Sequence, residues 1–344
     1  MKRAIGILTA LTMLLVLASC GGENAGGAVS SGDPGGTDEP LVIKVGTQDY
    51  PGSPDEKIYN YFCDLVSERS EGKIEIAIYN QSQLGSESEL LQQVMDGTLP
   101  GAAVGIGAFT RYTDLLSCIQ LPFLVDSYEL EYAAINSDIY QELLSEVGEQ
   151  LGVTFGAFQD PGMRQIAMIN KPINQLSDLS GAKIRCAENA LIQDTISALG
   201  ASPTAIAFTE LYTALQNKVV DGEDINMSSI YTQHHDEVIG YVSLLNLYPY
   251  TGCYVFNTEF VESLPEGYWD IIYTAMKEAE ELGLTQWIHE QEDVWAESIE
   301  SNGVAINSVE DLSEFEEAVQ SVYDKYTAVD ARIGEFIDYV NSQK

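Results

Sequence analysis

Arg164 and Arg185 are the residues of this chain best suited to bind an anion. With Lys171 and Lys183 they place four cations between residues 164 and 185 of an acidic chain that has 16 Lys and Arg against 53 Asp and Glu. A guanidinium group matches a carboxylate with two hydrogen bonds and keeps its charge on burial. Both arginines fall at or near the ends of expected strands, where a side chain can point into a cleft, so we predict that they bind a carboxylate. Lys171 and Lys183 are better explained as partners of the surplus acids.

The sequence carries no residue set typical of an activated catalytic group. His234 and His235 are neighbours, and so diverge in a strand or a helix, while His289 stands alone. It contains no nucleotide-binding glycine pattern, nucleophile elbow or paired-histidine metal motif. We therefore expect a binding protein without metal or cofactor, although abundant Asp and Glu leave a carboxylate pair, and hence an extracytoplasmic enzyme, open. The net charge of −37 argues against nucleic acid and anionic membrane surfaces as partners.

The first 40 residues predict export and a lipid anchor. Two basic residues precede an apolar stretch, 4–17, that is too short for an ordinary membrane span. The small residues before Cys20 match the bacterial lipoprotein pattern, so 1–19 is expected to be a signal peptide and Cys20 the lipidated first residue. Residues 20–40 then form the anchor and a flexible tether rich in Gly and Ser. A soluble body held near the membrane, on the cell surface or in the periplasm, is expected to follow.

The other four cysteines are widely spaced along the body. They form no CxxC pair and no metal-ligand spacing: Cys63, Cys118, Cys186 and Cys253. An even number outside the cytoplasm permits disulfides, but we expect scattered buried thiols.

Strand and helix patterns alternate along the body, which favours an α/β fold. Expected strands are 41–47, 73–79, 102–106, 152–158, 164–170, 183–186, 219–222 with its turn, and 254–257. Helix starts with capping residues at Ser53 and Ser86 separate the first three strands, so the sheet is expected to be mainly parallel and covered by helices. Ligands of such sheets bind beyond the carboxyl ends of the strands, and two such domains face each other across a cleft.

The C-terminal part predicts long helices. Residues 265–300 have no internal proline, and at roughly 1.5 Å per residue they would span about 54 Å, enough to bridge two domains. Gly283 is the expected bend. A final helix is expected at 308–340.

Several stretches of the body, in this order along the chain, resemble TRAP-type (tripartite ATP-independent periplasmic) solute-binding proteins. The stretches are 82–99, 121–124, 171–173, 178–185 and 200–224. The resemblance implies a two-lobed fold like that of type II periplasmic binding proteins, with mostly parallel sheets, flanking helices and a long helix spanning both lobes. Lobe I is then expected to comprise 41–161 plus 251–290, and lobe II 162–250 plus 291–344. It also implies a small organic acid as ligand and a membrane permease driven by an ion gradient as partner, and we expect a monomer.

The resemblance also assigns roles to individual residues. Arg185 matches the family arginine that holds the ligand carboxylate, and Arg164 a second arginine that assists. Phe208 matches an aromatic pocket wall, Glu87 a position that meets ligand hydroxyls, and Gln48 a polar contact after the first strand. Simpler explanations stay open for two of them, because Phe208 could be core and Glu87 could stabilise its helix N-terminus.

One departure from the family pattern follows the Asp221-Gly222 turn. Many members have Glu-Asn-Pro there, whereas this chain has Asp224-Ile225-Asn226, so either Asn226 replaces the usual Asn or the carboxylate loses that contact. Four polar candidates favour a hydroxylated acid, such as a sugar acid or dicarboxylate: Gln48, Glu87, Asp224 and Asn226. A binding protein of another importer class, or a receptor feeding a sensor kinase, stays open as an alternative.

Overall fold

The computed structural model describes residues 39–344. The predicted signal peptide, Cys20 and nearly all of the tether lie outside these residues. Among the described residues, no helix combines the length and the apolar character that crossing a bilayer requires.

The first of two sheets has the strand order β2-β1-β3-β10-β4. Its strands are β1 (Leu41–Gly46), β2 (Ile74–Tyr79), β3 (Gly101–Gly105), β4 (Val153–Gln159) and β10 (Gly252–Asn257). The strand β1 pairs in parallel with β2 and β3, whereas β10 runs antiparallel to both β3 and β4. The antiparallel strand is the one that returns to this sheet from the second.

The second sheet has the order β11-β9-β5-β8-β6-β7. Its strands are β5 (Gln165–Met168), β6 (Lys183–Cys186), β7 (Ser202–Ala205), β8 (Gly222–Ile225), β9 (Tyr241–Leu244) and β11 (Ala305–Ser308). Here the antiparallel strand is β5, the first that the chain forms after leaving the first sheet. Each sheet therefore contains both parallel and antiparallel pairs. In each, the antiparallel strand is the first that forms after the chain passes over from the other sheet.

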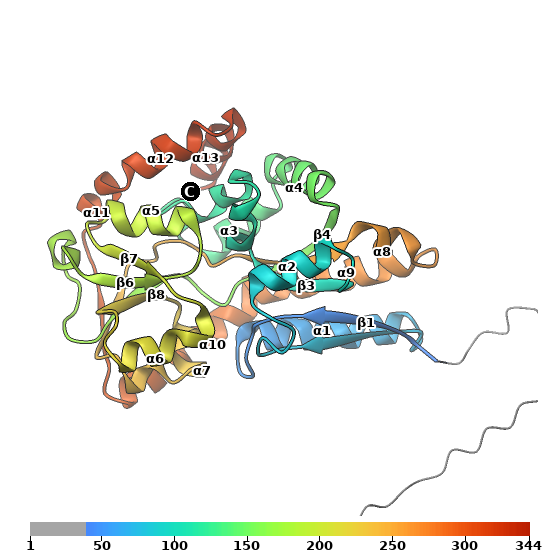
Figure 1. Cartoon of the computed structure of the whole chain (residues 1–344), viewed down its shortest axis with the longest axis horizontal. Coiled ribbons are helices and arrows are strands. Elements are labelled where there is room, and N and C mark those ends of the chain that lie inside the picture. Colours follow the sequence, from blue (N-terminus) through green and yellow to red (C-terminus); the bar gives the residue numbers. More distant parts are fainter. Residues whose placement is uncertain (1–38) are drawn as a thin grey trace, which may run out of the picture. The chain divides into compact units, whose positions relative to one another are not determined.

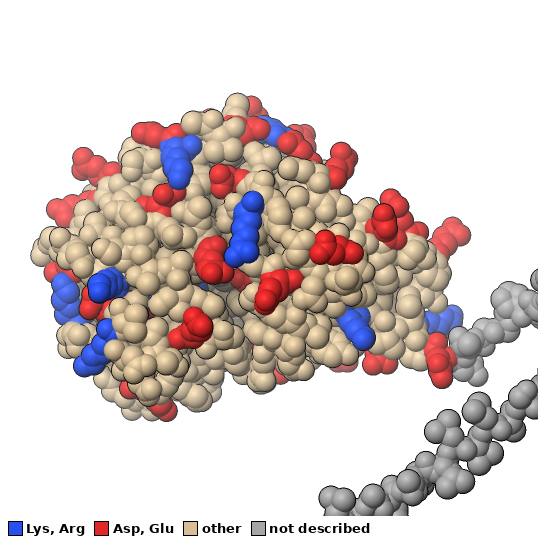
Figure 2. All heavy atoms as spheres, viewed as in Figure 1, with Lys and Arg blue, Asp and Glu red and all other residues tan. Residues whose placement is uncertain are grey.

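Helices cover both sheets, as Figure 1 shows. The α-helices are α1 (Pro54–Arg69), α2 (Glu87–Met95), α3 (Tyr128–Ile135), α4 (Asp138–Leu151), α5 (Ala190–Ala198), α6 (Leu211–Gln216), α7 (Met227–Thr232), α8 (Thr258–Ser263), α9 (Tyr268–Leu282), α10 (Ile288–Ser301), α11 (Ser313–Ala318), α12 (Gln320–Thr327) and α13 (Ala331–Gln343). Short 3₁₀ turns are η1 (Ile106–Arg111), η2 (Leu115–Gln120), η3 (Leu176–Leu179), η4 (Phe208–Glu210) and η5 (His235–Glu237). Acidic side chains are spread over the face in Figure 2, with fewer basic ones between them, as expected for solvated helix faces.

The predicted long helix is confirmed, and it contacts both halves of the body. The helices α9 and α10 are joined by one π-helical turn, η6 (Gly283–Trp287), into 34 continuous residues. Ile272 and Met276 of α9 join the apolar cluster of the first sheet, and Trp295 and Ile299 of α10 join a cluster of the second. A Cβ on Gly283 would lie 2.6 Å from Ile58 Cδ1, so glycine lets α1 approach where the helix changes its winding.

Two local expectations were wrong. Val219 and Val220 lie in a bend instead of a strand, because Lys218 with φ +55° turns the chain after α6 and pairing starts only at Gly222. The predicted helix 308–340 is three helices, α11 to α13. Asp330 caps α13 by accepting a hydrogen bond from the backbone N–H of Arg332, which fixes a new helix start within the apolar pattern.

All four described cysteines are free, as predicted, and three of them are buried. The helix α12 packs on α5, and α13 packs on α3 and α4. The lobe boundaries given above stay a prediction.

Candidate ligand-binding cleft

A cleft between the two sheets collects most of the predicted binding residues. It has about 1080 Å³ of empty space when the solvent at its mouth is included. Its lining comes from the β1–α1 loop, the start of α2, the ends of β3 and β4, the segments after β6 and β7, the start of α7, and Tyr250. These are mostly the carboxyl ends of strands, as expected for ligand sites of α/β sheets.

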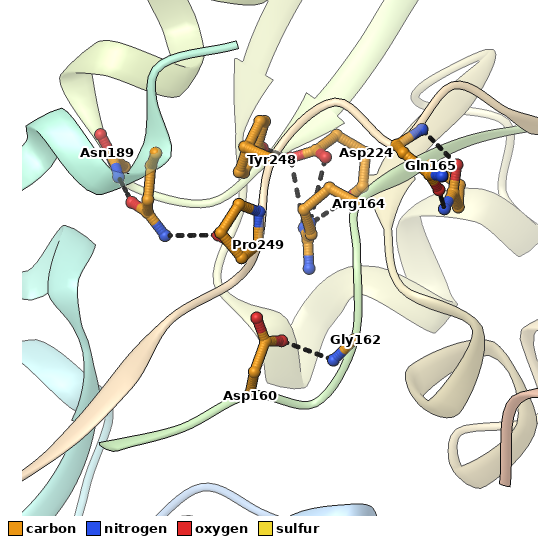
Figure 3. A network of polar contacts seen from close by, with 10 residues as sticks. Asp160, Gly162, Arg164, Gln165, Asn189, Asp224, Tyr248 and Pro249 are labelled. Atoms are coloured by element: carbon orange, nitrogen blue, oxygen red, sulfur yellow. Dashed lines mark hydrogen bonds and ion pairs between the residues drawn. The ribbon is translucent and has the colours of Figure 1, made fainter. Parts of the chain in front are cut away.

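Arg164 reaches the cleft from the first crossing between the sheets. Its backbone pairs with the returning segment, since its N–H donates to Tyr248 O over 2.9 Å and its carbonyl accepts from Leu247 N over 2.9 Å. The crossing is shaped by Gly162, whose φ of +127° favours glycine and whose N–H donates to Asp160 Oδ1 over 2.6 Å (Figure 3). Two chain segments thus run side by side between the sheets and fix the guanidinium between them.

The guanidinium of Arg164 is paired before any ligand arrives. Arg164 is 3% exposed, and its Nε and Nη2 donate to Asp224 Oδ1 and Oδ2 over 3.0 and 3.2 Å (Figure 3). Tyr248 Oη also donates to Asp224 Oδ2, over 2.6 Å, and the ring of Tyr250 lies 4.5 Å from the guanidinium carbon. Burial alone would lower the pKa of Arg164, but Asp224 and the neighbouring tyrosines raise it overall.

Arg185 lies on β6 and has a different environment. It is also 3% exposed, and its Nε and Nη2 both donate to Ile206 O, over 3.0 and 2.8 Å. Among residues 39–344, no carboxylate oxygen lies within 4.0 Å of its guanidinium nitrogens. Burial, followed by the charge of Arg164, lowers the pKa of Arg185. Arg185 is therefore a buried cation that is positioned by the backbone and has no anionic partner in the part of the chain that the structure describes. We call Arg164 and Arg185 the basic wall.

Carboxyl groups line the opposite side of the cleft. Glu87 accepts hydrogen bonds from Gly105 N over 2.8 Å and from Tyr250 Oη over 3.4 Å, and burial raises its pKa to about 7. Asp49 accepts from Thr47 Oγ1 and, over 3.1 Å, from Gln159 Nε2, and burial raises its pKa.

Asp55 is the third acid on this side. It lies in the first turn of α1, is 1% exposed and lines the cleft, yet neither carboxylate oxygen has a hydrogen-bond partner among the described residues. Burial, then the charges of Asp49 and Asp160, raises its pKa well above the ordinary value. We call Asp49, Asp55 and Glu87 the acidic wall.

Of the remaining predicted site residues, three line the cleft and Asp224 does not. Gln48, Phe208 and Asn226 line the cleft, and both polar side-chain atoms of the buried Asn226 lack partners among residues 39–344. Ile225, at the usual Asn position, belongs to the apolar cluster of the second sheet. Asp224 is not among the lining residues and contacts the cleft only through Arg164.

The two sides of the cleft also meet each other directly. The rings of Tyr50 and Phe208 contact edge to face with centroids 5.9 Å apart, and Arg111 Nη2 lies 3.5 Å from Glu188 Oε2 at the exposed rim. A Cβ on Gly107 would lie 2.7 Å from Asn189 Nδ2, so any larger residue would force the Asn189 side chain to shift. The two sides of the cleft are therefore in contact at three places.

The sequence did not predict that Tyr250, Asp49 and Asp55 line the cleft. Tyr250 lies in a returning loop that has no local motif. Asp55 looks like an ordinary helix-start residue, and nothing near it in the sequence indicates that its carboxylate faces a cleft. The one available signal was the position of Asp49 and Asp55 after the first strand of a parallel pair.

Comparison with known proteins gives a consistent result. A family model described as "Bacterial extracellular solute-binding protein, family 7" matches residues 45–329. The C4-dicarboxylate-binding periplasmic protein DctP of Rhodobacter capsulatus is 30% identical over 229 residues, covering 66% of this chain and 68% of that protein. The sialic acid-binding periplasmic protein SiaP of Vibrio cholerae is 26% identical over 294 residues, covering 86% of this chain and 90% of that protein.

Solved structures of TRAP periplasmic solute binding proteins share the fold. One from Roseobacter denitrificans with bound β-D-glucuronate has a TM-score of 0.82 at 24% identity, covering 87% of this chain and 98% of that one. One from Sulfitobacter sp. NAS-14.1 with β-D-galacturonate has a TM-score of 0.80 at 26% identity, covering 86% and 98%. One from Sulfurospirillum deleyianum with succinate has a TM-score of 0.81 at 24% identity, covering 89% and 100%. The predicted two-lobed α/β architecture is confirmed by this likeness.

Proposed function

Since the chain belongs to the bacterial extracellular solute-binding proteins of family 7, which bind solutes and are not enzymes, we propose that it captures a small organic acid in the cleft and delivers it to a TRAP permease. The protein is an extracytoplasmic solute-binding protein of the TRAP type. The ligand, the residues that hold it and the delivery step are the proposal.

The observation that carries the proposal is the unpaired state of Arg185. A buried cation without a counter-ion is costly, and the Ile206 carbonyl satisfies two of its donors without supplying charge. The Nη1 group of Arg185 is left for a ligand, and a carboxylate there would form charge-assisted hydrogen bonds away from water. Arg164 supplies a second donor group, which Asp224 already orients.

The relatives and the polar lining support a hydroxylated acid. Related structures hold glucuronate, galacturonate and succinate, and a related sequence is described as C4-dicarboxylate-binding. In this chain Gln48, Glu87 and Asn226 offer acceptors and donors for hydroxyl groups. Asp224 would act by holding Arg164 in place.

Capture would proceed by hinge bending. The two crossing segments, 160–164 and 246–251, and the long helix are the connections across which the predicted lobes would turn. The contact between the rings of Tyr50 and Phe208 belongs to the closed form of the protein, which the permease would recognise.

A lipid anchor on Cys20 would keep the binding protein beside its permease. Metabolic labelling with a palmitate analogue, compared between the wild type and Cys20→Ala, tests this part. We expect a labelled protein in the membrane fraction for the wild type and an unlabelled protein for the variant.

A thermal-shift screen of the mature body tests the ligand class. Sugar acids, dicarboxylates and keto acids are tested one by one, because a ligand at 100 times its Kd stabilises the native state by about 2.7 kcal/mol. We expect at least one acid to raise Tm, with the Kd confirmed by calorimetry. If no carboxylate raises Tm while a neutral or cationic solute does, the proposal is wrong.

A further inference from the structure

The cleft holds more negative than positive groups. Two guanidinium groups face three carboxyl groups, and Arg164 is already neutralised by Asp224 from behind. Glu188 also lines the cleft but pairs with Arg111 at the rim. A ligand carboxylate on Arg185 would therefore satisfy the basic wall but bring no positive charge to the acidic wall.

Asp55 is the member of the acidic wall that the protein leaves most incomplete. Glu87 and Asp49 each accept hydrogen bonds from the protein, whereas both oxygens of the buried Asp55 accept none from the described residues. A buried polar group without a protein partner is uncommon in native proteins and is completed by a ligand, an ion or a water molecule. The N-terminus of α1 favours the ionised form.

Resting on the proposed function, we infer that the natural ligand carries an ammonium or similar organic cation besides its carboxylate, with the cation against Asp55 and the carboxylate on Arg185. Hydroxyl groups could satisfy the free oxygens of Asp55, but only a cation would stabilise its ionised form. A single zwitterionic ligand supplies an anion for Arg185 and a cation that stabilises ionised Asp55, and it leaves Glu87 and Asn226 free to bind hydroxyl groups.

The geometry favours an organic cation over a metal ion. Within residues 39–344, no three or more His, Cys, Asp and Glu side chains are grouped closely enough to hold a metal. An ammonium group needs fewer acceptors and brings three donors of its own. The calorimetry also tests a metal ion as the counter-charge, by comparing binding with Ca²⁺ and with EDTA.

Two matched series of acids test the inference, because within each only the far end of the ligand changes. The four-carbon series is 4-aminobutanoate, 4-hydroxybutanoate and succinate, and the six-carbon series is 6-amino-6-deoxygluconate, gluconate and glucarate. Calorimetry at pH 7.5 is expected to rank the ammonium member first in at least one series, by about tenfold over the hydroxyl member. The same ranking is measured with Asp55→Asn, and with Asp64→Asn as the control on an exposed position of the same helix.

Asp55→Asn should remove the preference for the ammonium member, whereas Asp64→Asn should keep it. Calorimetry in buffers of different ionisation enthalpy gives a second readout. The ammonium ligand should release protons on binding, because burial and the charges of Asp49, Asp160 and Glu87 favour the protonated form of Asp55 in the free protein. The phenols of Tyr59 and Tyr254 also lie near Asp55, and its charge raises their pKa values.

Each other outcome contradicts a different statement. If the hydroxyl member binds as tightly as the ammonium member in both series, the inference is wrong but the proposed function stands. If gluconate binds tightly only with added Ca²⁺ and loses affinity in EDTA, the counter-charge is a metal ion and the inference is again wrong. If no acid of either series or of the wider screen binds, the proposed function itself fails.

Discussion

The basic and acidic walls of the cleft differ in how the protein stabilises their charged side chains. On the basic wall, each guanidinium is held by the protein, Arg164 by Asp224 and Arg185 by the carbonyl of Ile206. On the acidic wall, Asp55 is held by no hydrogen bond from the described residues. A guanidinium keeps its proton in almost any environment, whereas a buried carboxyl group can take up a proton to lose its charge. The basic wall is thus a fixed anchor, and the acidic wall is the part that responds to pH and to the ligand.

The largest effect is expected from removing the counter-ion of the basic wall. Asp224→Ala leaves the Arg164 guanidinium buried and unpaired and also removes the acceptor of Tyr248 Oη. Breaking a buried ion pair in this way costs about 3–5 kcal/mol of stability. Urea unfolding of the ligand-free protein measures the loss.

The matched control is Glu290→Ala, which breaks the exposed pair between Lys57 and Glu290. An exposed pair contributes about 0–1 kcal/mol, so the control should unfold almost like the wild type. Equal losses for the two variants would mean that Arg164 does not depend on Asp224 for its burial.

The next effect concerns binding. Arg185→Ala removes the unpaired cation of the basic wall, so affinity for the acid found in the screen should fall by about 2–5 kcal/mol, which is tenfold or more. Lys183→Ala is the control, because Lys183 lies on the same strand with its side chain exposed. Unchanged affinity in a folded Arg185→Ala protein would remove Arg185 from the site.

The acidic wall predicts a pH effect of smaller size. Burial raises the pKa of Glu87 from 4.5 to about 7, so between these values the folded protein holds a proton that the unfolded chain has lost. Stability from this group is therefore complete below about pH 4.5 and is lost as pH rises towards 7.

Glu87→Gln mimics the protonated form, so its free energy of unfolding should fall less steeply with pH than that of the wild type. The difference in slope should be less than about 1.4 kcal/mol per pH unit. Unfolding by urea at several values between pH 4.5 and 7.5 measures both slopes in the absence of ligand. Glu89→Gln on the same helix is the control, because hydrogen bonds from Ser86 lower the pKa of Glu89 instead. Parallel curves for Glu87→Gln and the wild type would show that Glu87 ionises as it does in the unfolded chain.

The basic wall was far easier to predict from sequence than the acidic wall. Arg185 lies on a strand whose predicted range, 183–186, the structure reproduces, and arginine is rare enough in this chain to be conspicuous. Asp55 is one of 53 acidic residues, and its raised pKa depends on burial and on acids far along the chain, among them Asp160. The pairing of Asp224 with Arg164 depends on the register that sets Ile166 opposite Asp224, which no local pattern specifies.

Elements were predictable where local signals were strong. The capping pair of Ser86 and Glu89 forms as expected at the start of α2. The strand expected at 219–222 failed because two valines favour a strand but Val220 instead fills the core from a bend. Of the two valines, Val220 is buried and Val219 is 53% exposed, so the apolar pattern predicted neither the strand nor the burial of both residues.

The smallest predicted effect lies at the rim, where a charge from each side of the cleft meets. Arg111 and Glu188 are 3.5 Å apart and both more than half exposed, so water and salt screen their attraction. Arg111→Gln should weaken ligand binding by about fivefold or less, and the difference from the wild type should vanish in 1 M salt. Calorimetry at low and high salt measures this. A loss as large as that of Arg185→Ala would mean that closure, more than the charge held inside the cleft, sets the affinity.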